Sequence, residues 1–276
     1  MQEFSTIPPC ADRLTRPATA VVRGWLRILI LAWLLTLVPC TPALAISDEI
    51  QVYTDEINEP GERGLELHIN TTPRGRKTAE YEGDIAPYRG LRVTPEFSWG
   101  LTKTLEAGLY VPMTTSANGT FYVGGLKGRL KWLPIKTESG WYAGANAELS
   151  NVSRAFSESR LSTELRIMAG YHDDDWLLGI NPIFDWGLSR GFRGSPEVLM
   201  TWKATRRVAE GISLGGEYYN GLGTLANRLP AEQQQRALYL VMDFERKPWI
   251  FNLGIGHGLN SATDAWTIKA IFEVPF

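Results

Sequence analysis

Twelve segments of this chain alternate between apolar and polar side chains at every second position. This pattern predicts β-strands that have one apolar and one polar face. The last segment shows it well, because Ile268, Phe272 and Val274 share one face while Lys269 and Glu273 lie on the other. The segments are 64–72, 90–102, 105–115, 121–135, 140–152, 159–173, 175–188, 195–208, 211–223, 234–247, 249–262 and 264–276.

The connections between these segments alternate in length. Those near 103, 137–139, 174, 209 and 248 are short, whereas most of the others are longer and rich in Gly, Pro, Ser and charge. Short periplasmic turns and longer extracellular loops are typical of outer-membrane barrels. The sequence therefore predicts an all-β protein, a closed antiparallel transmembrane β-barrel of about 12 strands (within 10 to 14). An even strand number places both ends of the barrel domain, 64–276, on the periplasmic side.

The tryptophans support a membrane barrel. All those in the strands fall on the apolar phase, and six of them (Trp99, Trp132, Trp141, Trp176, Trp202 and Trp249) lie toward the expected periplasmic end. An indole is apolar and carries an N–H that favours water, so it gathers at a bilayer interface. The predicted membrane-interface aromatics are Trp99, Trp132, Trp141, Tyr171, Trp176, Trp186, Trp202, Trp249 and Trp266.

The opposite phase of the strands is polar and charged. In a soluble β-sandwich these side chains would face solvent, and alternation alone fits both architectures. A sandwich does not explain a ring of tryptophans, so we expect a barrel whose lumen holds these groups. The candidate lumen-lining residues are Glu66, His68, Arg92, Glu96, Glu106, Lys127, Arg129, Lys131, Glu148, Glu164, Arg166, Asp185, Glu197, Lys203, Glu217, Asp243, Glu245, Lys269 and Glu273.

The first 45 residues have the pattern of a cleaved signal peptide. Four arginines precede the apolar run Ile28–Val38, and Ala43-Leu44-Ala45 forms a cleavage site. Cys40 suggests a lipoprotein signal instead, but Pro39 fits that cleavage poorly. We expect cleavage after Ala45 and export to the outer membrane of a Gram-negative bacterium.

Removal of this leader changes the composition. Both cysteines leave with it, so disulfides and thiolate metal sites are excluded from the exported chain. The leader carries four arginines against Glu3 and Asp12, which leaves 24 basic and 28 acidic side chains, a net charge of −4. That balance argues against a nucleic-acid partner. No cofactor or metal is expected.

The two ends of the exported chain carry further signals. Residues 46–63 precede the first strand and form either a periplasmic arm or a partial plug of the lumen. The chain ends in Phe276, in phase with Val274, Phe272 and Ile268. This ending resembles the C-terminal strand by which bacterial outer-membrane proteins engage their assembly machinery. The expected partners are that machinery, outer-membrane lipid and a small solute.

Several stretches resemble a known family. They are 49–53 (EIQVY), 56–61 (EINEPG), 64–70 (GLELHIN), 106–112 (EAGLYVP) and 181–185 (NPIFD). The chain resembles a largely uncharacterised proteobacterial outer-membrane family, similar to the channels grouped with the meta-pathway of phenol degradation. The resemblance covers nearly all of the exported chain and implies a barrel-forming porin or transporter. It implies no substrate and no functional residues.

The leading functional hypothesis is a channel or transporter for a small solute. The candidate lumen residues include eleven acidic and seven basic groups, which predicts a weak cation preference. Lys127, Arg129 and Lys131 form a basic row that favours an anionic group locally. The alternative is a structural barrel closed by salt bridges. Inward tyrosines (Tyr110, Tyr142, Tyr219 and Tyr239) offer stacking surfaces to a solute, or else pack against glycines such as Gly144 and Gly215.

An outer-membrane lipid hydrolase is the alternative from another class, but the chain is not expected to be an enzyme. Catalysis of that kind needs a Ser-His pair and a group that orients the imidazole. His68 is expected to pair with Glu66. His172 is expected to cap the short turn that it shares with Asp173–Asp175, where consecutive residues converge poorly on a metal. His257 lies on the lipid-facing phase near the outer rim, and Ser261 shares its face.

Overall fold

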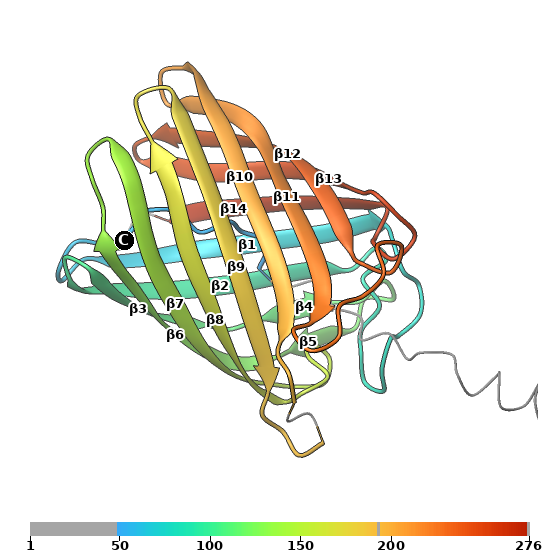
Figure 1. Ribbon diagram of the computed structural model, residues 1–276. Helices are drawn as coiled ribbons and strands as arrows, with labels where there is room; N and C mark the ends of the chain where they lie inside the picture. The colour runs from blue at the N-terminus through green and yellow to red at the C-terminus, as the bar shows by residue number, and fades with distance from the viewer. Residues whose placement is uncertain (1–48, 192–193, 275–276) are drawn as a thin grey trace, which may run out of the picture. The chain divides into compact units, whose positions relative to one another are not determined.

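The computed structural model describes residues 49–191 and 194–274, and these form a closed antiparallel β-barrel (Figure 1). The signal-peptide prediction (1–45) and the prediction for Phe276 lie outside the described residues. No helix occurs within the described ranges. The strands are β1 (Arg63–Arg74), β2 (Leu91–Thr102), β3 (Leu105–Tyr110), β4 (Met113–Thr115), β5 (Phe121–Val123), β6 (Gly125–Ile135), β7 (Gly140–Val152), β8 (Leu161–His172), β9 (Trp176–Gly187), β10 (Glu197–Ala209), β11 (Ile212–Thr224), β12 (Arg236–Arg246), β13 (Trp249–Gly258) and β14 (Trp266–Val274).

The wall closes because β1 pairs with both β14 and β2. Leu65 lies opposite Val274 on one side and opposite Phe97 on the other, and both pairings are antiparallel. β3 with β4, and β5 with β6, are each one wall strand with an interruption, so the barrel has the twelve strands that the sequence predicts. Closure removes the two long edges of the sheet, whose unpaired backbone groups a bilayer does not tolerate. The short strand β5 ends the sheet order and is paired with β4.

The interruptions are the main departure from the predicted strands. The segments 105–115 and 121–135 were expected to be continuous, but they break at Pro112 and at Gly124. Proline has no N–H to donate to a ladder. Its carbonyl instead accepts the Gly124 N–H at 2.7 Å, and Val111 donates to the Pro95 carbonyl at 3.1 Å. The local ladder is therefore rebuilt around the proline.

The two ends of the barrel differ in the length of their connections. β2–β3, β6–β7, β8–β9, β10–β11 and β12–β13 are joined by short turns at one end. The other connections are mostly longer and lie at the opposite end, as predicted. β1 begins and β14 ends at the short-turn end, which is the consequence of an even strand number.

The outer face of the wall is apolar and the inner face is largely polar, which is the reverse of a soluble protein. On β12, Leu240 is 74% exposed on the outer face, whereas its neighbour Tyr239 is 5% exposed on the inner face. On β6, Leu130 and Trp132 are exposed while Arg129 and Lys131 are buried. An apolar outer band and a polar interior are the arrangement of a transmembrane barrel. The described residues contain no helix with the length and hydropathy of a membrane-spanning helix.

Candidate functional site

The charged residues assigned to the lumen are mostly enclosed by the wall. The buried ones are His68, Arg92, Glu96, Glu106, Arg129, Lys131, Glu148, Arg166, Glu217, Asp243 and Lys269. The half-buried ones are Glu66, Lys127, Glu164, Asp185, Glu197, Lys203 and Glu273. Glu245 differs, because it is exposed at the end of β12 near the short-turn rim. Strand pleating places these groups on one face, since successive side chains alternate across the sheet.

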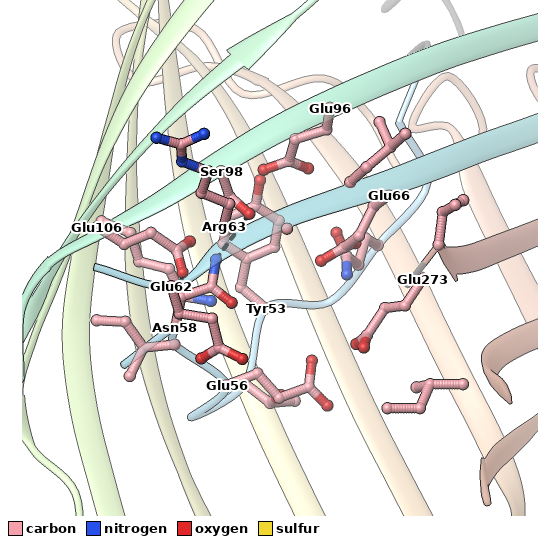
Figure 2. Close-up of a pocket in the computed structure, with 18 of the residues that line it drawn as sticks. Tyr53, Glu56, Asn58, Glu62, Arg63, Glu66, Glu96, Ser98, Glu106 and Glu273 are labelled. Carbon is pink, nitrogen blue, oxygen red and sulfur yellow. Dashed lines mark hydrogen bonds between the residues drawn. The ribbon is translucent and has the colours of Figure 1, made fainter. Parts of the chain in front are cut away.

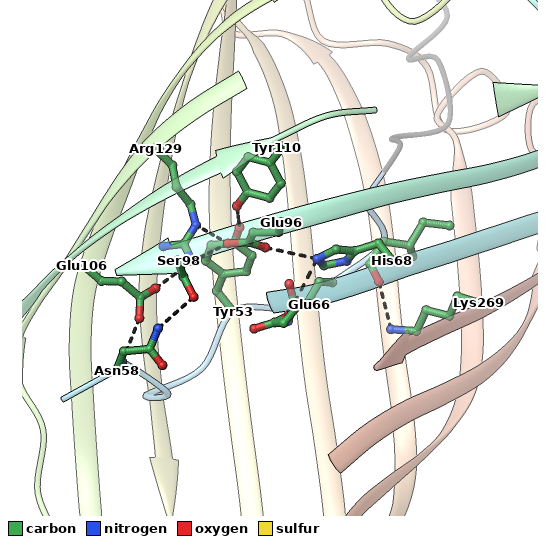
Figure 3. Close-up of polar contacts among 12 residues, drawn as sticks. Tyr53, Asn58, Glu66, His68, Glu96, Ser98, Glu106, Tyr110, Arg129 and Lys269 are labelled. Atoms are coloured by element: carbon green, nitrogen blue, oxygen red, sulfur yellow. Dashed lines mark hydrogen bonds and ion pairs between the residues drawn. The ribbon is translucent and has the colours of Figure 1, made fainter. Parts of the chain in front are cut away.

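Residues 49–62, which we call the N-terminal arm, run through the interior of the barrel (Figure 3). The arm contacts side chains from wall strands that are far apart in the sheet order, including β3, β8, β9 and β14. Ile50, Val52 and Tyr53 are each no more than 5% exposed. A segment that touches so many parts of a closed wall must lie inside it.

The central contact of the arm joins Tyr53 to Asn181 on β9. The Tyr53 backbone N–H donates to Asn181 Oδ1 at 2.7 Å, and Asn181 Nδ2 donates to the Tyr53 carbonyl at 3.0 Å. The amide side chain thus satisfies both backbone groups, as a neighbouring strand would. The Tyr53 hydroxyl also lies 2.6 Å from the Tyr110 hydroxyl on β3. Tyr53 therefore spans the lumen from β9 to β3.

Three more contacts fix the arm along its length. Lys269 Nζ donates to the Ile50 carbonyl at 3.0 Å, and Arg166 Nη1 donates to the Gln51 carbonyl at 3.0 Å. Nearer the short-turn end, the Asn58 N–H donates to Glu106 Oε2 at 2.7 Å. Charged wall groups thus supply the hydrogen bonds that a buried loop backbone would otherwise lack.

Arg129 is the centre of a charged cluster on β1, β2, β3 and β6 (Figure 3). Its Nε donates to Glu96 Oε1 at 2.6 Å, and its Nη2 donates to Glu106 Oε1 at 2.7 Å. His68 Nε2 lies 3.1 Å from Glu96 Oε2 and 3.7 Å from Glu66 Oε2. The expected pair of His68 with Glu66 is present, and the closer partner is Glu96.

A second cluster is centred on Glu217 of β11. Its Oε2 lies 2.5 Å from Lys269 Nζ, and its Oε1 lies 3.8 Å from Lys203 Nζ. Lys203 also bonds Asp243 Oδ1 at 2.8 Å, so the charges continue onto β12. The Tyr219 hydroxyl donates to Glu217 Oε2 at 2.6 Å. The side chains of Lys269 and Glu217 are almost completely buried, so each depends on the other for charge compensation.

Two further ion pairs lie on β6, β7 and β8. Lys127 Nζ is 2.9 Å from Glu148 Oε1, and Arg166 Nε is 3.1 Å from Glu164 Oε1. The Arg166 guanidinium also lies 4.1 Å from the centroid of the Tyr53 ring, within the range of a cation–π contact. The basic row of Lys127, Arg129 and Lys131 is thus divided, since Lys127 and Arg129 pair with different carboxylates.

Two large cavities lie inside the barrel that the described residues form, and they share no lining residue. The first, of about 1140 Å³, opens at the short-turn end and is lined by arm residues from Gln51 to Glu62 together with Glu66, Glu96 and Glu273 (Figure 2). The second, of about 430 Å³, lies beneath the long loops and meets the arm at Ile50. The arm therefore lies between two hollows at opposite ends of the barrel.

Two of the inward tyrosines, Tyr142 and Tyr239, pack against glycines other than the ones expected. A Cβ on Gly170 would lie 2.2 Å from the Tyr142 hydroxyl, and a Cβ on Gly256 would lie 2.3 Å from the Tyr239 ring. Gly215 faces wall backbone, and Gly144 faces wall backbone and the Met168 side chain. Tyr219 and Tyr239 also line the loop-side cavity, where their ring centroids are 5.3 Å apart.

The outer aromatic residues gather near the short-turn end. Trp141, Trp176 and Trp249 lie within the first two residues of their strands, and Trp99 and Trp132 lie three residues before the ends of theirs. Trp202 does not fit this belt, because it lies in the middle of β10. Trp186 and Trp266 lie at the long-loop end of β9 and β14.

The two remaining histidines have structural partners. His172 ends β8, with Nε2 2.8 Å from the Thr137 carbonyl and Nδ1 3.5 Å from Asp55 of the arm. It thus joins two turns and the arm rather than capping its own turn. His257 Nδ1 lies 2.8 Å from the Ala265 carbonyl, and its ring is 4.6 Å from that of Trp266.

At each end of the barrel, a carboxyl group outside the strands accepts hydrogen bonds from backbone N–H groups. Asp173 Oδ1 accepts the N–H groups of Trp176 and Asp175 at 2.8 Å each, and these bonds lower the pKa of the carboxyl. At the loop end, Asp264 accepts the Arg76 N–H at 2.7 Å. Burial raises the pKa of Asp264, although the hydrogen bond and charge of Arg76 oppose that rise.

Comparison with known proteins finds solved structures of the same fold. No family model matches it, and no curated protein matches it. Among solved structures, the COG4313 outer membrane channel from Pseudomonas putida F1 superposes with a TM-score of 0.59 at 14% identity, covering 83% of this chain and 100% of that one. This chain and that channel therefore share the fold of a closed β-barrel.

Two other solved barrels are more distant. The NanC porin gives a TM-score of 0.47 at 11% identity, with 76% of this chain and 98% of that chain covered. LpxR from Salmonella typhimurium gives a TM-score of 0.45 at 10% identity, with 77% and 100% covered. The grouping with meta-pathway channels finds no support in these comparisons.

Proposed function

We propose that the protein is an outer-membrane channel or transporter for a small solute, closed in this state by its own N-terminal arm. The observation that carries the proposal is the pair of cavities on either side of the arm. A barrel filled only by wall side chains has no need of a separate segment in its lumen, whereas a channel that must be closed at rest does. The arm is held by hydrogen bonds and ion pairs, which can break and reform.

The proposal includes the location and orientation of the barrel. A cleaved leader exports the chain, and a C-terminal strand ending in Phe276 directs its insertion. Lipid then surrounds the outer face, in the outer membrane of a Gram-negative bacterium. The short turns then face the periplasm, and the aromatic residues at that end lie at the membrane interface. The resemblance in sequence adds membership of the group of meta-pathway channels, without a substrate.

Cation preference follows from the charges around the loop-side cavity. Six carboxylates line it (Glu148, Glu158, Glu164, Asp185, Glu197 and Asp264), and Lys127 is the one basic side chain among its described lining residues. The cavity at the other end is closer to balance, with six acidic and five basic side chains. Rings of carboxylates raise the local concentration of cations and favour their passage.

Catalysis is not part of the proposal. A lipid hydrolase needs a serine hydroxyl within hydrogen-bond reach of an imidazole. The contacts of His257 in the described part of the chain are with the Ala265 carbonyl and the Trp266 ring, and neither is with a serine.

The test is the reversal potential of the refolded chain 46–276 in a planar bilayer under a tenfold potassium chloride gradient. We expect discrete conductance steps and a modest cation preference. Glu158→Gln with Glu197→Gln should reduce that preference, whereas Glu232→Gln, an exposed loop residue outside the cavity lining, should leave it unchanged. Anion preference, or equal effects of both changes, would contradict the proposed selectivity. A folded barrel without conductance would favour a structural barrel closed by salt bridges.

A further inference from the structure

Three adjacent strands of the wall carry carboxylates at the same level. Glu66 of β1 lies directly opposite Glu96 of β2 on one side and directly opposite Glu273 of β14 on the other. Like charges at directly opposed positions of a sheet repel each other. Such a row needs positive charge close by.

His68 lies two residues after Glu66 on the same face of β1. Its Nε2 is 3.1 Å from Glu96 Oε2 and 3.7 Å from Glu66 Oε2, and the three ligand atoms of this group all lie within 4.8 Å of one another. Two ligands of a tetrahedral zinc ion, each bound at about 2.1 Å, are about 3.4 Å apart. The two distances from His68 Nε2 to the carboxylate oxygens, 3.1 and 3.7 Å, thus lie on either side of the ligand spacing of a zinc ion.

The neighbouring groups leave these atoms available to a cation. Glu96 divides its oxygens, with Oε1 bonded to Arg129 and Oε2 turned toward His68. Arg129 also compensates Glu106, so its single charge is shared between two carboxylates. The other ring nitrogen of His68, Nδ1, is buried and has no hydrogen-bond partner among the described residues. The position of the ring therefore depends on what Nε2 binds.

The group is also accessible. Glu66 and Glu96 line the 1140 Å³ cavity at the short-turn end, so an ion and its remaining water ligands can enter from that side (Figure 2). The three residues project from two hydrogen-bonded strands of a closed wall, so little ordering is needed when an ion binds. A divalent ion supplies two positive charges and bonds both carboxylates at once, whereas a proton on His68 supplies one.

We propose that Glu66, His68 and Glu96 form a binding site for a divalent transition-metal ion, of the class that zinc represents, in the wall of the lumen. One imidazole and two carboxylates suit zinc and similar ions, whereas calcium and magnesium prefer oxygen ligands alone. The remaining coordination positions face the cavity. The site does not depend on whether the barrel conducts.

The experiment is calorimetric titration of zinc chloride into the refolded, chelator-treated chain 46–276 in detergent. We expect one zinc ion per barrel that His68→Gln removes, and an affinity at least about tenfold weaker in Glu66→Gln. Glu96 is left unchanged because it also holds Arg129. Retained heat-modifiable migration on a gel would show that each variant folds, and Glu66→Gln serves if His68→Gln does not fold.

His172→Gln is the matched control, because His172 also lies near a carboxylate, Asp55, but near one rather than two. It should leave zinc binding unchanged. Cobalt(II) gives a second readout, since its visible absorption on binding should be lost in His68→Gln, need a higher cobalt concentration in Glu66→Gln, and be unchanged in His172→Gln. Absence of zinc binding, or binding that both variants retain, would overturn the proposal. Loss of binding in His172→Gln alone would place the ion at the turn and overturn it as well.

Discussion

The backbone of Tyr53 is paired with the side-chain amide of Asn181, which accepts its N–H at 2.7 Å and donates to its carbonyl at 3.0 Å. The two residues are 128 positions apart in the chain. Asn181 is completely buried, so neither bond is replaced by water while the arm stays in place. This pairing is the contact on which the proposed closure of the lumen depends most directly.

Replacement of Asn181 by Ala should loosen the arm. Loss of two buried hydrogen bonds costs about 2 kcal/mol, which is roughly a 30-fold change in the equilibrium between closed and open arm. We expect more frequent and longer conductance steps. Asn146→Ala is the matched control, since Asn146 is equally buried in the interior and its Oδ1 has no hydrogen-bond partner in the described part of the chain. The same open fraction in both variants would refute this role of Asn181.

Glu217→Gln should destabilise the barrel, because Lys269 would lose its main buried counter-charge. Removal of one partner of a buried ion pair costs about 3–5 kcal/mol. The measurement is the urea midpoint of unfolding from lipid bilayers. The double variant Glu217→Gln with Lys269→Met should recover part of the loss, since it leaves no buried ammonium at position 269.

Glu138→Gln provides the comparison for this ion pair, as Glu138 is exposed in the β6–β7 turn. A surface change of that kind should alter stability by no more than about 0.5 kcal/mol. If Glu217→Gln were equally mild, the buried network would not support the wall.

The tryptophans should differ in membrane depth. In variants that keep a single tryptophan, Trp141 and Trp249 should be quenched most by lipids brominated near the headgroup, because they begin their strands at the short-turn end. Trp202 should be quenched most by lipids brominated toward the chain ends, since it lies in the middle of β10. Equal quenching profiles would argue against the aromatic belt.

The β8–β9 turn should be sensitive to acid. Two backbone hydrogen bonds lower the pKa of Asp173, so the stability they contribute is fully present above the ordinary value of about 3.9. That contribution is lost as the pH falls through the lowered pKa. Carbon-13 NMR of the carboxyl should show a titration midpoint below the ordinary range. A midpoint at or above it would mean that the turn is not held by this carboxylate in solution.

The wall was predictable because lipid and lumen impose a period of two on each strand. The segment 140–152 was predicted with the bounds that β7 has, and every other strand lies close to its predicted range. The breaks at Pro112 and Gly124 were missed, although the missing N–H of a proline inside a strand pattern was a usable signal. The residues on either side of Pro112 continue the apolar–polar alternation in the same phase, so the pattern alone predicts a continuous strand there.

The lumen was only partly predictable. The phase of each strand identified which charges face inward, but not which of them meet. Glu96 and His68 come together through the register of β1 with β2, and Glu217 meets Lys269 across 52 positions of sequence. Asn181 lies within the stretch 181–185 that resembles the family, but a polar residue on the inward phase gives no sign of a backbone partner. The path of the arm depends on such long-range contacts. Composition and periodicity therefore do not decide whether residues 46–63 form a periplasmic arm or a partial plug of the lumen.

Deletion of the arm tests the proposed closure. Single-channel conductance of the chain 46–276 is compared with that of a variant lacking residues 49–57, both shown to be folded by heat-modifiable migration. If the arm closes a channel, the intact chain should show small or rare steps, and the shortened chain large and sustained ones. Silence from both folded proteins, or identical conductance, would contradict closure of a channel by the arm.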